Sequence, residues 1–110
     1  MNDHKAEIGP VVVALPPEID VTNSDAVYRD LMAVLTPGVH AVIADLTATS
    51  FCDSSGVHAI VRAHEEAAAR QVALRVAVSP EGSVRRVLQL TGAVLVMPVH
   101  ETVAEALSAA

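Results

Sequence analysis

Short runs of aliphatic and β-branched residues alternate along the chain with longer segments of helical periodicity. The apolar runs occupy residues 11–15, 39–45, 72–78 and 94–99, and each is nearly continuous. Continuous β-branched runs are typical of strands buried inside a sheet. A weaker strand is expected around residues 4–8, before a turn at Gly9-Pro10.

Two segments with helical periodicity are found, one before residue 40 and one after it. The earlier one can be capped by Thr22, Asn23 or Ser24, is stopped by the sequence Thr36-Pro37-Gly38, and carries one apolar stripe of Val27, Leu31, Val34 and Leu35. The later one starts near Asp53 and places on one face Val57, Ile60, Val61, His64 and Ala68. Each stripe predicts a helix that packs one face against the core.

Two further helices are expected in the last third of the chain. Ser79 is a suitable N-cap and Pro80 suits the first helical position, so a helix is predicted from there to Gly92. Its apolar stripe consists of Val84, Val87, Leu88 and Thr91. A short fourth helix is predicted over residues 100–107.

Strands that alternate with helices predict an α/β layer fold. Open sheets of this kind carry their functional loops at the carboxyl ends of the strands. Functional residues are therefore expected in the loops at residues 16–23, 46–55 and 79–82.

Composition narrows the choice of function. The chain has 110 residues, 13 of them acidic and 7 basic, and its only aromatic residues are Tyr28 and Phe51. This balance argues against a nucleic-acid partner, which needs basic and aromatic side chains. The apolar runs are too short to insert into a membrane, and the first residues lack a signal-peptide core. We expect one acidic, soluble, cytoplasmic domain over residues 1–110.

The loop after residue 45 contains the most informative segment. Asp53 is a good N-cap, so Ser54 and Ser55 fall in the first turn of the second predicted helix. Gly56 follows, although glycine in a helix costs about 1 kcal/mol relative to alanine. A glycine at this position allows another backbone or a partner to approach closely.

The segment Phe51-Cys52-Asp53-Ser54-Ser55-Gly56-Val57 resembles the signature of STAS domains of the anti-sigma factor antagonist type. Residues 17–21 resemble the Gly-Glu-Ile/Leu-Asp segment of that family, and residues 84–92 resemble its late helix that ends in glycine. The three matches occur in the family's order and span most of the chain. The resemblance implies a single-domain STAS-like fold with a mixed, mostly parallel sheet of four to five strands and about four helices.

The resemblance also implies a function, which is partner switching. The unphosphorylated antagonist binds an anti-sigma factor that is also a serine kinase, and thereby frees a sigma factor. The kinase phosphorylates the first serine of the motif, here Ser54, which releases the antagonist, and a phosphatase removes the phosphate. The residues expected at or near the partner-binding site are Asp20, Asp53, Ser55, Gly56, His58 and Arg62.

Two departures from the family pattern leave other functions open. Pro17 stands where glycine is usual, and His58 stands where a small residue is common. His58 lies one helical turn from Ser54, where it can pair with a phosphate when protonated or point to solvent. One alternative is a non-switching STAS scaffold or accessory subunit of a signalling or lipid-transport complex. Another is a small-ligand or nucleotide sensor that holds an anion at the second helix's N-terminus.

The same residues argue against an enzyme. Asp53, Ser54 and His58 lie within about one helical turn, which does not provide the geometry of a catalytic triad or an oxyanion hole. The five histidines are scattered without metal-ligand spacing, and the sole cysteine, Cys52, is expected to be a small buried apolar residue. We therefore expect no catalytic residue, no metal and no cofactor.

Overall fold

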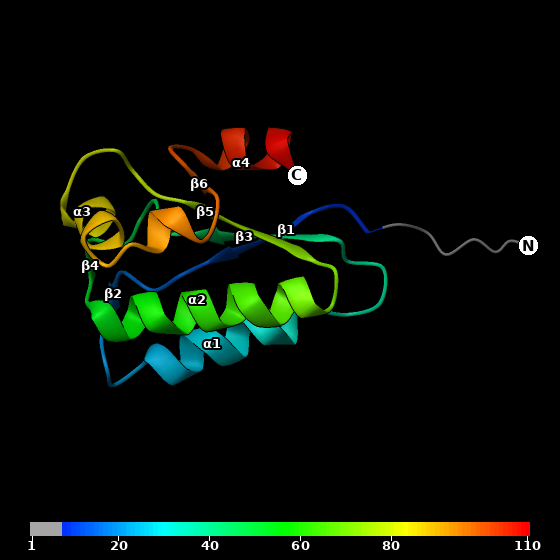
Figure 1. The fold of residues 1–110 in the computed structure, drawn as a ribbon, viewed down its shortest axis with the longest axis horizontal. Coiled ribbons are helices and arrows are strands. Elements are labelled where there is room, and N and C mark those ends of the chain that lie inside the picture. Colours follow the sequence, from blue (N-terminus) through cyan, green and yellow to red (C-terminus); the bar gives the residue numbers. More distant parts are fainter. Residues whose placement is uncertain (1–7) are drawn as a thin grey trace, which may run out of the picture.

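A four-stranded parallel sheet forms the centre of the computed structural model, which describes residues 8–110 (Figure 1). Its strands are β1 (Val11–Ala14), β3 (Ala41–Asp45), β5 (Ala73–Ala77) and β6 (Val99–His100), in the order β1-β3-β5-β6. All three pairings are parallel, so the carboxyl ends of these strands share one edge of the sheet.

A second, two-stranded sheet lies beside that edge. It pairs β2 (Glu18–Ile19) with β4 (Phe51–Cys52) in parallel, with Ile19 opposite Cys52. The sequence did not predict these strands, because two residues are too few to show a period. They arise from pairing between two of the loops that follow β1 and β3.

Helices cover the main sheet on both faces (Figure 1). The helices α1 (Ser24–Ala33) and α2 (Ser54–Ala69) pack together on one face, and the short α4 (Val103–Ala109) covers part of the other. The helix α3 (Ser83–Leu90) and the 3₁₀ turn η1 (Ala93–Leu95) lie near the N-terminal end of α2. The predicted α/β fold with four helices is confirmed.

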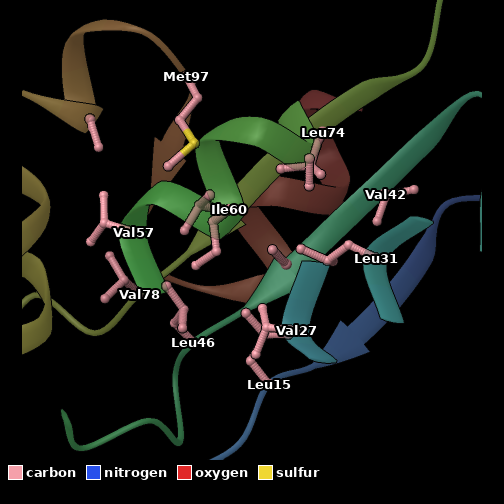
Figure 2. Packing of buried hydrophobic residues seen from close by; sticks show 14 of the residues in the cluster. Leu15, Val27, Leu31, Val42, Leu46, Val57, Ile60, Leu74, Val78 and Met97 are labelled. Atoms are coloured by element: carbon pink, nitrogen blue, oxygen red, sulfur yellow. The ribbon is translucent and has the colours of Figure 1, made fainter. Parts of the chain in front are cut away.

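The core between the sheet and α1 and α2 is aliphatic. Figure 2 shows Val27 and Leu31 of α1 with Ile60 of α2, beside Val42 and Leu74 of the sheet. Each of these five side chains is almost fully buried. A smaller cluster under α4 contains Ile43, Ala77 and Ala106.

The predicted start of α2 is confirmed, whereas two stripe positions are wrong. Asp53 is the N-cap of α2, as expected. Ala68 and Thr91 are exposed, although both were assigned to buried faces. The first helix ends at Ala33, before the predicted stripe does.

The predicted start of α3 at Ser79-Pro80 is wrong. The helix begins at Ser83, and its N-cap is Gly82 with φ of 95°. The Ser79 hydroxyl instead donates to the carbonyl oxygen of Thr47 at 3.3 Å. A turn that only glycine adopts easily therefore sets the start of this helix.

The predicted strand over residues 94–99 is also wrong for most of its length. Gly92 has φ of 80° and leads into η1, so that only Val99 and His100 join the sheet. The run is apolar, but Leu95 and Val96 are exposed.

Most of the predicted strand at residues 4–8 lies outside the described residues. Its last residue, Ile8, forms an isolated parallel bridge with Val39. Within residues 8–110, no helix is long and apolar enough to cross a membrane.

Candidate functional site

Three loops meet at the carboxyl edge of the sheet, and hydroxyl groups connect them. The Thr49 hydroxyl donates to the carbonyl oxygen of Pro16 at 2.8 Å, and the Ser50 amide donates to that of Pro17 at 2.8 Å. The Ser83 hydroxyl donates to the carbonyl oxygen of Ser50 at 3.4 Å. These hydrogen bonds hold the loops together beside the start of α2.

Proline at position 17 is compatible with these hydrogen bonds. The loop uses only the carbonyl oxygen of Pro17, which accepts from the amides of Ser50 and Phe51 at 2.8 and 3.3 Å. Proline has no amide hydrogen to donate, but its carbonyl oxygen is the group that these two hydrogen bonds use. Pro17 therefore supports the pairing of β2 with β4.

The same turn recurs at the ends of three parallel strands. In each, an aspartate Oδ1 accepts from the amide and the hydroxyl of the residue two positions later; the pairs are Asp20 with Thr22, Asp45 with Thr47, and Asp53 with Ser55. The Asp-x-Ser/Thr pattern is visible in the sequence and is the signal by which all three turns can be predicted. It fixes the exit of each strand by a local hydrogen-bonded turn.

Asp53 accepts one hydrogen bond from a side chain in addition to the backbone bonds of an ordinary N-cap. Its Oδ1 accepts from the amides of Ser55 at 3.0 Å and Gly56 at 3.3 Å, and from the Ser55 hydroxyl at 2.5 Å. The Ser55 hydroxyl, followed by these amides, holds the pKa of the Asp53 carboxyl below its ordinary value. The residue before Ser54 is therefore a carboxylate at neutral pH.

The two serines of the motif differ in their surroundings. The Ser55 hydroxyl donates to Asp53 and is partly buried. The Ser54 side chain is exposed, and its hydroxyl makes no hydrogen bond to any described residue. Of these two hydroxyls, that of Ser54 is the one available to an incoming group.

Gly56 is buried against the chain itself. A Cβ at this position would lie 2.6 Å from Cys52 Sγ and 2.6 Å from Ile19 Cγ2. The close approach expected at this glycine is therefore made by β2 and β4. Gly56 positions Ser54 by letting α2 start directly on the small sheet.

His58 and Arg62 lie on the same face of α2 as Ser54, because residues four apart share a helix face. Both are exposed. The Arg62 guanidinium lies over the ring of Tyr28 in α1, 4.2 Å from its centroid. This contact directs the charge of Arg62 and links the two helices.

An open groove begins at Ser54 and runs between α2 and the segment around η1. Its volume is about 330 Å³, and its lining consists of Ser54, Val57, His58, Val61, Thr91, Gly92, Ala93 and Val96. The sequence did not predict this groove, because residues 94–99 were assigned to a strand.

Asp20 and Asp53 follow the paired residues at the ends of β2 and β4. Ile19 pairs with Cys52, and the Asp53 amide donates to the carbonyl oxygen of Ile19 at 3.1 Å. Asp20 and Asp53 are thus the next residues on two adjacent strands. The predicted site residues that lie together at the start of α2 are Asp20, Asp53, Ser54, Ser55 and Gly56. Arg62 lies two helical turns further along α2.

Cys52 is the buried apolar residue that the sequence predicted. It is 1% exposed, and burial, with a smaller effect of the Asp53 charge, raises the pKa of its thiol to about 11. The thiol is therefore protonated at neutral pH. Among residues 8–110, no group of three His, Cys, Asp or Glu side chains is placed to hold a metal ion.

A comparison with protein-family models shows the family of the chain. The model of the STAS domain family matches residues 3–106. The chain therefore belongs to the STAS domain family, as its motif at residues 51–57 indicated.

Solved structures show the same fold. An anti-sigma factor antagonist from Mycobacterium paratuberculosis is 28% identical, with a TM-score of 0.81 over 98% of this chain and 88% of that chain. A candidate anti-sigma factor antagonist from Thermotoga maritima, TM1081, is 21% identical, with a TM-score of 0.70 over 88% of this chain and 85% of that chain. An NMR structure of TM1081 gives a TM-score of 0.75 at 19% identity, over 98% of this chain and 92% of that chain. No curated protein sequence matches the chain.

Proposed function

We propose that this single STAS domain is an anti-sigma factor antagonist that works by partner switching in the cytoplasm. The unphosphorylated form binds an anti-sigma factor kinase, and phosphorylation of Ser54 releases it. The observation that carries the proposal is the difference between the two serines. Ser54 is exposed and uncommitted at the start of α2, whereas the Ser55 hydroxyl is held by Asp53.

Similarity to the Mycobacterium antagonist supports the same function. That protein is 28% identical to this chain and covers almost all of it. It is described as an anti-sigma factor antagonist, and the described residues of this chain offer a surface serine and a groove for a protein partner. We therefore infer a regulatory binding protein and not an enzyme.

Electrostatics explains how a phosphate on Ser54 acts as a switch. The amides of Ser55 and Gly56 already bind Asp53, so the phosphate does not gain these donors without displacing the cap. Phosphorylation adds a charge of about −1.5 to −2 beside the Asp53 carboxylate. Like charges brought together at an interface cost several kcal/mol, and each 1.4 kcal/mol changes an affinity tenfold. Release therefore requires no refolding of the domain.

Phosphopeptide mapping after incubation with ATP and each anti-sigma kinase of the same cell tests the proposal. We expect one phosphate on Ser54, none on the Ser54→Ala variant, and an unchanged Ser54 site in the Ser55→Ala control. A phosphatase of the same pathway should remove it. If active kinases leave Ser54 unmodified in the folded protein, the scaffold or accessory-subunit function replaces this one.

The nucleotide-sensor alternative has less support. It needs the amides at the start of α2 for an anion, and Asp53 occupies two of them. Calorimetry with nucleotides should therefore give no heat of binding. A measurable heat at micromolar protein would favour the sensor.

A further inference from the structure

Ser54 and His58 line the same groove at the start of α2. They are four residues apart on the helix, a spacing that places Cβ atoms about 6 Å from each other. Both side chains are exposed. Helical side chains lean toward the N-terminus of their helix, so the ring of His58 leans toward the turn that carries Ser54. A group attached to the Ser54 hydroxyl is therefore within reach of the imidazole.

His58 is the ionisable side chain of this groove. The wall opposite α2 consists of uncharged residues, which are Thr91, Gly92, Ala93 and Val96. The remaining α2 residues along the groove are Val57 and Val61. Any positive charge that the lining of the groove supplies to a phosphate on Ser54 is thus that of His58.

No carboxylate within residues 8–110 forms an ion pair with His58. The charged residues on the elements around it are Asp53, Arg62 and Glu65 at or on α2, Asp25, Arg29 and Asp30 on α1, and Arg85 and Arg86 on α3. In the described part of the chain, the ion pair that does form joins Arg70 to Glu66. The imidazole is therefore free to pair with a new negative group.

The backbone and the nearest arginine compete little with His58 for such a phosphate. The amides of Ser55 and Gly56 already donate to Asp53, at 3.0 and 3.3 Å. Arg62 lies over the ring of Tyr28, 4.2 Å from its centroid. Eight residues of helix also separate Arg62 from Ser54, which is about 12 Å along the axis. His58 is only half that distance away.

We propose that His58 binds the phosphate on Ser54 and directs it away from the Asp53 cap. This inference rests on the proposed function and adds a phosphate-binding residue to the same site. The negative group precedes the positive one along the helix, which is the more favourable order for a pair four residues apart. Histidine changes its charge between pH 5 and 8, the interval in which a phosphoserine loses its second proton. An imidazolium beside the phosphate favours that loss, because it stabilises the dianion more than the monoanion.

Phosphorus NMR of the full chain, with phosphoserine genetically incorporated at position 54, tests the proposal. The phosphate resonance, followed between about pH 4 and pH 9, gives the midpoint of the second ionisation, which is about pH 6 for a phosphate without partners. His58→Gln removes the imidazole, and His58→Lys keeps a positive charge. His40→Gln is the matched control, because His40 is also exposed but precedes β3, at the end of the sheet opposite the site.

We expect a lower midpoint in the chain that carries His58 than in His58→Gln, by about 0.2–0.4 pH units, the size typical of an exposed pair four residues apart on a helix. His40→Gln should keep the lower midpoint and His58→Lys should restore it. Sodium chloride at about 1 M should reduce the difference, because salt screens exposed pairs. Equal midpoints with and without His58, or an equal rise in His40→Gln, would overturn the proposal.

The experiment needs no kinase, so its failure is distinguishable from failure of the proposed function. Equal midpoints would show that His58 does not bind the phosphate, while Ser54 could still be the residue that a kinase modifies. A lower midpoint, together with kinases that leave Ser54 unmodified, would support the pairing of His58 with the phosphate and contradict partner switching.

Discussion

Asp53 makes the two adjacent serines chemically different. It accepts the Ser55 hydroxyl and two amides of the first turn, and it leaves Ser54 free. One side chain therefore caps α2, fixes Ser55 and places a negative charge beside the proposed phosphorylation site.

Replacing Asp53 with asparagine tests its charge at constant shape. The pKa of the folded carboxyl lies below its ordinary value of 3.8, so the charged form stabilises the folded protein. That contribution is complete above the unfolded pKa and disappears as the pH falls through the folded one. We expect the wild type to melt above Asp53→Asn near pH 7 and the gap to narrow below about pH 4. A gap that stays constant between pH 7 and pH 2 would contradict the assigned hydrogen bonds.

Gly56→Ala tests the close packing of α2 on the small sheet. Alanine favours a helix by about 1 kcal/mol, but overpacking a core costs roughly 1–3 kcal/mol. Because the new Cβ would lie 2.6 Å from buried atoms of both Ile19 and Cys52, we expect a cost at the upper end of that range and a net loss of about 1–2 kcal/mol. Chemical denaturation measures this loss. Gly9→Ala is the control, since nothing lies within 4 Å of its Cβ; equal effects at both positions would contradict the packing.

At the scale of elements, the contact of Arg62 with Tyr28 joins α1 to α2. A cation–π pair at the surface contributes about 0.5–1 kcal/mol. We expect a double-mutant cycle with Arg62→Gln and Tyr28→Leu to give a coupling free energy of that size. Tyr28→Phe keeps the ring and should keep the coupling free energy. A coupling free energy of zero would show that the contact does not stabilise the protein.

The elements that the sequence predicted well are those with their own local signal. The start of α2 has a cap at Asp53 and a long apolar stripe, and β3 is a continuous buried run. The motif at residues 51–57 likewise lies in one segment. These features can be predicted because the residues that cause them are neighbours in the sequence.

The elements that were missed or misplaced depend on distant residues or on glycine. The pairing of β2 with β4 joins positions more than 30 residues apart, and neither strand has a pattern of its own. Gly82 and Gly92 set the start of α3 and the entry to η1 by positive φ angles that the composition of the run does not reveal. The groove beside Ser54 was missed for the same reason, because half of its lining lies at residues 91–96, where Gly92 turns the chain.

At the scale of the whole molecule, the parallel sheet brings three loops to one edge. Hydroxyl and amide bonds from Thr49, Ser50 and Ser83 connect these loops. The site therefore stands on a cross-linked base rather than on a single free loop. This predicts that a phosphate on Ser54 changes the surface and leaves the fold in place.

The affinity of one anti-sigma factor for the phosphorylated and unphosphorylated protein tests this account most directly. Both forms come from one preparation, treated with kinase and ATP or left untreated, and circular dichroism monitors the fold of each. We predict at least tenfold weaker binding of the form phosphorylated on Ser54, with an unchanged spectrum. Equal affinities, or a loss of affinity accompanied by unfolding, would contradict the account.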